Sequence, residues 1–173
     1  MKKTDSKRIV REYHMVQEAG PARIFSLLCP VREYDWIPLW HCELLHTQSG
    51  VAELGCVFRT DFGDQWGAET WVVSHYRPDE KIAFVRTGAL RTTRYEVILA
   101  SDRNDPAITH LTWRQEITGL NPEGNKFVVA ASADEEFQAM MAALNAMLAH
   151  YLATGKSLSL AHAAGKLPEE SAG

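Results

Sequence analysis

Short alternating apolar segments fill most of this chain, and one long amphipathic helix follows them. The alternation runs from about Arg8 to Ile117, and the helical pattern covers residues 134 to 154. Alternation with a period of two is typical of half-buried strands, whereas apolar residues at i, i+3, i+4 and i+7 indicate one buried helix face. This order predicts an α+β domain in which a curved antiparallel sheet of about seven strands wraps around the long helix and encloses a cavity.

Turn residues divide the alternating region into separate strands. Gly, Asp, Asn and Pro recur at short intervals, which favours antiparallel hairpins over crossover helices. In one predicted strand, Tyr95 and Val97 alternate with Arg94 and Glu96, so one sheet face is apolar and the other charged. We expect these charged residues to form ion pairs on the outer face. The predicted strands cover residues 9–16, 42–48, 57–62, 68–76, 81–87, 91–100 and 108–118.

Three helical segments are predicted. A short helix begins at Pro21, and a second helical turn begins at Pro30 and ends before Pro38. The long helix has acidic residues in its first turn and Gly155 at its expected end, and we expect Met140, Leu144, Leu148 and Tyr151 to be buried. Residues 121–125 indicate a turn, and a mixed connection through residue 133 leads into the long helix.

Composition fits a single globular domain, which we place over residues 1–156, with residues 157–173 as a flexible tail. The chain has 173 residues, of which 46% are hydrophobic and 23% charged. Its net charge of -4 and the absence of a basic stripe argue against a nucleic-acid partner. Apolar runs are too short for a membrane span, which requires about 18 residues, so we expect a cytoplasmic protein.

The three cysteines, Cys29, Cys42 and Cys56, have no paired zinc-ligand spacing. Their odd number favours reduced thiols in a reducing compartment over disulfides. We therefore expect no metal and no cofactor.

The order of elements, with one strand, two short helices, six strands and a long final helix, is that of the helix-grip fold. Over about residues 8–154 the chain resembles the START-like superfamily, also called SRPBCC, which includes polyketide cyclase/dehydrase-like proteins and lipid-transfer domains. The segment Cys29-Pro30-Val31-Arg32-Glu33-Tyr34-Asp35-Trp36 resembles one found in an uncharacterised bacterial subgroup. The resemblance implies a hydrophobic cavity between sheet and helix, used for binding and sometimes for acid–base chemistry.

Ten residues are candidate contacts for an apolar ligand. Aromatic rings and methionines can line such a cavity, although the same side chains commonly fill a core. We expect Trp36 or Trp40 at the cavity entrance, because the short helices should cover one end of the groove. The candidates are Tyr34, Trp36, Trp40, Trp71, Tyr95, Trp113, Met140, Met141, Leu144 and Tyr151.

Three residues are candidates for acid–base chemistry. Arg86 shares strand parity with Ile82 and Phe84, so it either points into the cavity to orient an oxyanion or reaches solvent at the strand end. His75 could act as a general base if it lines the cavity, or be an ordinary surface or core histidine. Tyr95 could assist in proton transfer.

These residues support three hypotheses. The first is a carrier or sensor that binds a hydrophobic small molecule, such as a lipid, a polyketide-like compound or an aromatic compound. The second is a metal-independent cyclase- or aromatase-like enzyme. The third is a co-chaperone-like module that binds proteins through its outer sheet surface, which a closed dry core would favour.

Overall fold

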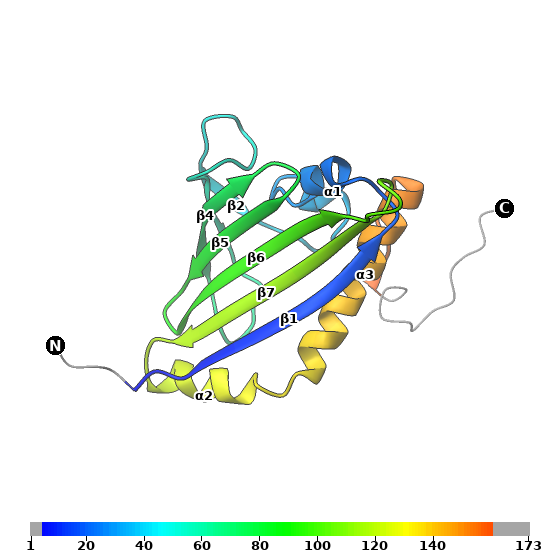
Figure 1. Ribbon diagram of the computed structural model, residues 1–173. Coiled ribbons are helices and arrows are strands. Elements are labelled where there is room, and N and C mark those ends of the chain that lie inside the picture. The colour runs from blue at the N-terminus through cyan, green and yellow to red at the C-terminus, as the bar shows by residue number, and fades with distance from the viewer. Residues whose placement is uncertain (1–4, 161–173) are drawn as a thin grey trace.

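One antiparallel sheet forms the body of the protein in the computed structural model, which describes residues 5–160. Its strand order is β1-β7-β6-β5-β4-β3-β2, so every strand from β2 to β7 pairs with its neighbour in sequence and β1 joins β7 (Figure 1). The meander and the helix-grip architecture predicted from the sequence are confirmed. The strands are β1 (Arg8–Gln17), β2 (Glu43–His46), β3 (Val57–Thr60), β4 (Glu69–Arg77), β5 (Lys81–Thr87), β6 (Arg91–Ser101) and β7 (Thr109–Gly119).

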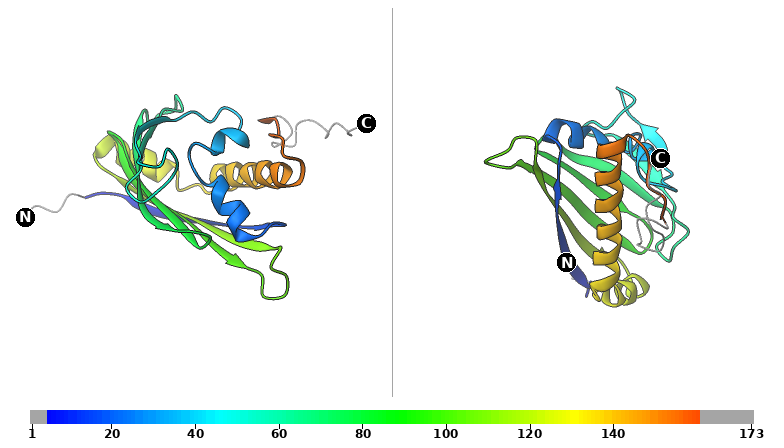
Figure 2. Two further views of the ribbon diagram at one scale, coloured as in Figure 1. Left: turned by 90° about the horizontal axis from the view of Figure 1, so that it is seen from above. Right: turned by 90° about the vertical axis from the view of Figure 1, so that its right-hand side faces the viewer.

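The long helix α3 (Glu135–Thr154) lies on the concave side of the curved sheet (Figure 2). It ends at Gly155, whose φ of 70° is the left-handed conformation that glycine adopts easily. Two short elements, α1 (Pro21–Leu27) and the 3₁₀ turn η1 (Glu33–Asp35), connect β1 to β2 and pack near the C-terminal half of α3.

A further helix, α2 (Pro122–Ala130), replaces the turn and mixed connection expected from the sequence. Asn121 accepts a hydrogen bond from the Gly124 amide at 2.8 Å, and Pro122 occupies the first helical turn. Asn and Pro begin turns as well as helices, so the local signal is shared by both structures. A Cβ on Gly124 would lie 1.9 Å from the Leu90 carbonyl oxygen, so only glycine lets α2 approach the β5–β6 hairpin this closely.

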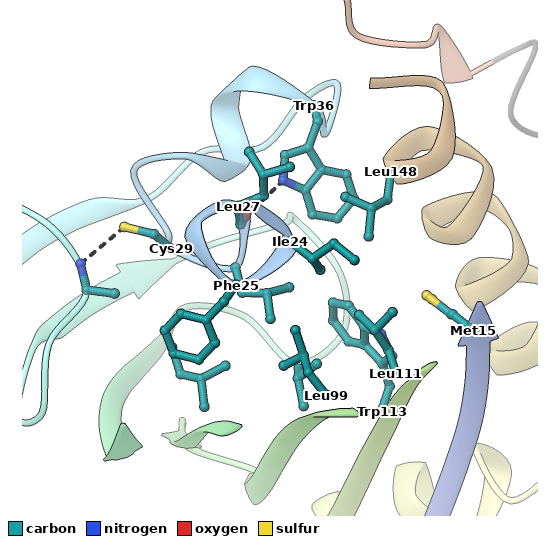
Figure 3. Close-up of a cluster of buried hydrophobic side chains, with 14 of the residues drawn as sticks. Met15, Ile24, Phe25, Leu27, Cys29, Trp36, Leu99, Leu111, Trp113 and Leu148 are labelled. Atoms are coloured by element: carbon teal, nitrogen blue, oxygen red, sulfur yellow. Dashed lines mark hydrogen bonds between the residues drawn. The ribbon is translucent and has the colours of Figure 1, made fainter. Parts of the chain in front are cut away.

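The core is closed at the end of the sheet covered by α1. Trp36 and Ile24 are fully buried there against Leu148 of α3, and the Trp36 indole donates a hydrogen bond to the Leu27 carbonyl at 2.9 Å (Figure 3). Leu158 is buried in the same core, although it lies in the predicted tail; the rest of that tail, from residue 161, lies outside the described residues. The division at residue 156 stays a prediction.

Candidate functional site

A cavity of about 550 Å³ lies between the concave face of the sheet and the N-terminal half of α3. Its volume falls within the roughly 300–1,000 Å³ range of small-molecule sites. Strands β1 and β3 to β7 form its floor, while Phe137, Met140 and Leu144 of α3 face it from above. The cavity adjoins the closed core, and Trp113 belongs to both.

Strand register brings polar groups into one row on the cavity floor. Arg11 of β1 pairs with Gln115 of β7, Gln115 with Tyr95 of β6, and Tyr95 with Phe84 of β5. Two residues further along β5, Arg86 lies opposite Trp71 of β4. Side chains at alternate positions share a sheet face, so these rows point toward α3 together.

Aromatic rings form a continuous wall along this floor. Phe58 stacks on Trp71 with ring centroids 5.4 Å apart, and Trp71 meets Phe84 edge-to-face at 5.9 Å. Tyr95 continues the series, with its ring 6.3 Å from Phe84 and 5.7 Å from Trp113. The site therefore offers an extended aromatic surface that is rigid because each ring is held by its neighbours.

Six of the ten candidate ligand contacts line the cavity. They are Trp40, Trp71, Tyr95, Trp113, Met140 and Leu144. Trp40 lies beside Phe62 with ring centroids 5.8 Å apart, and its indole donates a hydrogen bond to the Pro30 carbonyl at 2.8 Å. The expected roles of these residues in binding stay predictions, but their positions permit contact with one ligand.

The other four candidates lie outside the cavity lining. The Tyr34 hydroxyl bonds to both the amide and the carbonyl of Cys42, so this ring fastens η1 to the start of β2. Trp36 and Met141 are fully buried in the closed core. Tyr151 packs half-buried against the same core; it shares a helix face with Leu144 but lies two turns further along α3, beyond the cavity.

The burial expected for α3 is correct only for Leu148 among the four residues named. Met140 is 46% exposed, while Leu144 and Tyr151 are half-buried. Met140 and Leu144 lie four residues apart and face the cavity, whereas Phe137, Met141, Leu148 and Leu152 form the buried stripe. The helix thus divides its apolar surface between core and cavity.

Arg86 and Tyr95 line the cavity, but the third acid–base candidate does not. His75 follows a register shift in β4 between Val73 and His75, and it is half-buried away from the cavity. Its Nε2 atom has no hydrogen-bond partner among the described residues. A bulge changes which face the following side chains occupy, so strand parity alone could not place His75.

A buried ion cluster at the β5–β6 hairpin was not anticipated from the sequence. Arg91 donates two hydrogen bonds to the carboxylate of Glu69, both at 2.7 Å, and its guanidinium lies 3.9 Å from the Trp66 ring centroid. The Arg86 Nε atom is 3.5 Å from the same carboxylate, and its guanidinium lies 4.7 Å from the Trp71 ring centroid. Two arginines therefore share one carboxylate.

Glu33 of η1 is a second unanticipated residue at the cavity. Removal from water raises the pKa of its carboxyl from 4.5 to about 8, because a charged carboxylate is poorly solvated there. Burial, followed by the nearby Glu33 carboxyl, also raises the pKa of the Tyr95 hydroxyl. Both groups are predominantly protonated at neutral pH. The pKa of Glu33 lies near neutral pH, which is the range that favours general acid–base catalysis.

The raised pKa of Glu33 predicts a specific loss of stability with pH. An unfolded glutamate ionises near 4.5, while the folded one keeps its proton to about 8, so the free energy of unfolding should fall as pH rises through this window. Glu33→Gln should remove that fall and be more stable than the wild type at pH 8.5 by on the order of 2 kcal/mol, because Glu33 is half-buried and solvent screens part of the effect.

Urea unfolding at pH 5 and pH 8.5 measures this difference. Glu43→Gln, on the exposed edge strand β2, is the matched control and should retain the wild-type pH dependence. Parallel pH profiles for the wild type and Glu33→Gln would contradict the assignment.

Over residues 5–160 no group of His, Cys, Asp and Glu side chains is arranged to hold a metal ion. In the same range, no helix has the length and apolar character needed to cross a membrane.

The charges of the convex face pair with one another, and Glu96 among them is buried. Glu96 contacts Lys81 at 2.7 Å and Arg94 at 2.6 Å, and Arg114 contacts Glu116 at 3.0 Å. None of them lines the cavity, as the alternation predicted.

Comparison with solved structures identifies the fold. The chain is similar to the Mll3558 protein of Rhizobium loti, with a TM-score of 0.60 and 15% identity over 83% of this chain and 99% of that one. It is also similar to truncated norcoclaurine synthase of Thalictrum flavum, with a TM-score of 0.64 and 12% identity over 89% of this chain and 98% of that one. The chain has the helix-grip fold.

A third similar structure is DynU16, a protein of the dynemicin biosynthetic locus, with a TM-score of 0.56 and 20% identity. That match covers 89% of this chain but only 49% of DynU16, so the chain spans about half the length of that protein. No protein-family model and no curated protein matches the chain. The bacterial subgroup suggested by residues 29–36 therefore stays a prediction.

Proposed function

We propose that this protein binds a hydrophobic small molecule, aromatic or polyketide-like in character, in the cavity between the sheet and α3, as a carrier or sensor. The observation that carries the proposal is the continuous wall of aromatic rings from Phe58 to Trp113 along a cavity of about 550 Å³. Burying an apolar ligand there removes surface from water at roughly 25 cal/mol per Å². A structure of the similar norcoclaurine synthase holds the aromatic compounds dopamine and hydroxybenzaldehyde, which supports this ligand class.

Tryptophan fluorescence provides the test, because Trp40 and Trp36 occupy the same segment but different environments. Trp40 lines the cavity, whereas Trp36 is fully buried in the closed core. Titration with the neutral fluorophore N-phenyl-1-naphthylamine should change the tryptophan emission of the wild type. Trp40→Phe should reduce that change, and Trp36→Phe, the matched control, should leave it intact.

Two outcomes would contradict these expectations. Binding with an unreduced response in Trp40→Phe would remove Trp40 from the site. Absence of binding by a panel of polycyclic and long-chain probes, both neutral and carboxylic, together with no ligand retained in native mass spectrometry of fresh protein, would contradict the proposed function.

A second candidate function is metal-independent, cyclase- or aromatase-like chemistry, which the Glu33 and Tyr95 pair favours. A carboxyl that titrates near neutrality beside a half-buried phenol can donate and accept protons on a bound carbonyl compound. Glu33→Gln should then abolish turnover of a poly-β-keto thioester analogue while ligand binding persists. The co-chaperone hypothesis, which a core closed along the whole helix would favour, is less well supported, because a cavity lies beside the closed core.

A further inference from the structure

Arg86 is a buried cation whose hydrogen-bonding capacity is unused. Its side chain is only 11% exposed, and its Nε atom has no hydrogen-bond partner within residues 5–160. None of its guanidinium nitrogens donates a hydrogen bond to another described residue. A guanidinium carries five N–H donors, and leaving a buried donor such as Nε–H without an acceptor is unfavourable.

The neighbouring carboxylate does not satisfy Arg86 in the observed geometry. Glu69 lies 3.5 Å from its Nε, beyond good hydrogen-bond distance, while its two oxygens accept the short hydrogen bonds from Arg91. The cluster of two arginines and one carboxylate therefore carries one unbalanced positive charge. Burial and the adjacent Arg91 lower the pKa of Arg86 to about 10, so the group remains charged at neutral pH.

Other charges on the cavity lining add to this imbalance. Arg11 reaches the Ala131 carbonyl at 3.2 Å and the Gln115 side chain at 3.3 Å, both neutral acceptors. Asp64 lies near enough to Arg86 to raise its pKa slightly, but Asp64 and Glu136 are both exposed, so water screens much of their charge. The Arg86 side of the cavity is consequently electropositive as well as aromatic.

We infer that the ligand is an amphipathic monoanion whose single carboxylate binds Arg86 while its apolar body lies along the aromatic wall. This inference rests on the proposed function and adds the chemical class of the ligand. A planar carboxylate can accept two parallel hydrogen bonds from a guanidinium, and it would balance the one excess charge. A dianionic phosphate would exceed that balance and lose more hydration in an aromatic site.

The position of Arg86 suits this role. The guanidinium carbon of Arg86 lies 4.7 Å from the Trp71 ring centroid, so the ring covers one face of the guanidinium. The N–H groups at the edge of the guanidinium can still bind a ligand. Arg86 also lines the cavity together with Tyr95, whose protonated hydroxyl could donate to the same carboxylate.

Matched acid and ester probes test the inference on the wild-type protein. We would measure the binding of 1-pyrenebutyric acid and its methyl ester, and of dodecanoic acid and methyl dodecanoate, at pH 7.5. Each acid should bind at least tenfold more tightly than its ester, because hydrogen bonds between two charged groups are the strong ones.

Substitution then tests whether Arg86 is the cause of the preference for acids over esters. Arg86→Met retains an unbranched apolar side chain but no charge, so it should lower acid affinity at least tenfold and leave ester affinity within about twofold. Arg94→Met is the matched control, because Arg94 lies on the convex face of β6, paired with Glu96. That variant should retain the acid preference.

Each outcome has one meaning. Equal binding of acid and ester, or an acid preference that survives in Arg86→Met, overturns this inference and leaves the proposed function standing. Failure of every acid and ester to bind contradicts the proposed function itself.

Should Arg86→Met not fold, carboxyl-¹³C dodecanoic acid bound to the wild type replaces it. The bound carboxyl carbon should titrate at lower pH than in the free acid, because the guanidinium favours its ionised form. An unshifted or raised titration would overturn the inference.

Discussion

Replacing Glu69 by glutamine is expected to lower the free energy of unfolding by about 3–5 kcal/mol, the range for removing one partner of a buried ion pair. The Glu69 side chain is 3% exposed and contacts Arg91 at 2.7 Å and Arg86 at 3.5 Å. Glutamine keeps the shape of the side chain but removes its charge. Both arginines would then remain buried without a counter-ion, and urea unfolding followed by circular dichroism measures the cost.

The three-residue arrangement also predicts an order of effects. Arg91→Met should cost less than Glu69→Gln, because the freed carboxylate can form a shorter contact with Arg86, which already lies beside it. Glu43→Gln is the control: its pair with Arg59 is 56% and 48% exposed, so the loss should stay below about 1 kcal/mol. A Glu69→Gln cost no greater than that of Glu43→Gln would show that the cluster is not a buried charge centre.

Most of the sheet could be predicted because its signals are local. Alternation and turn residues predict β5 over residues 81–87, as observed, and every other strand end within two residues. The short strands β2 and β3 are overextended in the prediction, because polar residues follow them without a strong break. Helix α2 was missed, since its start at Asn121 and Pro122 resembles a turn and its support comes from packing of Gly124 against Leu90.

The cavity lining was only partly predictable, because it depends on backbone direction between elements. Trp36 and Trp40 have similar sequence surroundings, yet one is buried in the core and the other lines the cavity. The chain leaves η1 at Trp36 and turns again at Leu39, whose φ of 64° is unusual for a residue with a side chain. Neither bend has a sequence signal strong enough to separate the two rings.

The charged part of the site required knowledge of register. Strand parity leaves Arg86 either facing the cavity or reaching solvent at the strand end, and in the structure it lines the cavity. Glu69 and Arg91, however, lie 22 residues apart at strand ends, where charged residues are usually solvent-exposed. Only the pairing of β4, β5 and β6 brings them together.

Leu148→Ala should destabilise the protein by about 2–5 kcal/mol, the usual cost of emptying a buried leucine site. Leu148 is fully buried against the closed core formed with α1 (Figure 3). Leu144→Ala, one turn earlier on α3, is the matched comparison, because both changes replace a leucine in the same helix by alanine. Leu144 is half-buried and faces the existing cavity, so its loss should cost only about 1 kcal/mol, since less apolar surface is removed from contact.

The two substitutions should therefore have opposite consequences for stability and binding. Leu148→Ala should lower the urea midpoint strongly and leave the affinity for N-phenyl-1-naphthylamine near the wild-type value in protein that remains folded. Leu144→Ala should lower the midpoint little and change that affinity, because it alters the surface that a ligand contacts. Equal destabilisation by both would mean that α3 packs against the sheet along its whole length and that the space beside Leu144 is not open to a ligand.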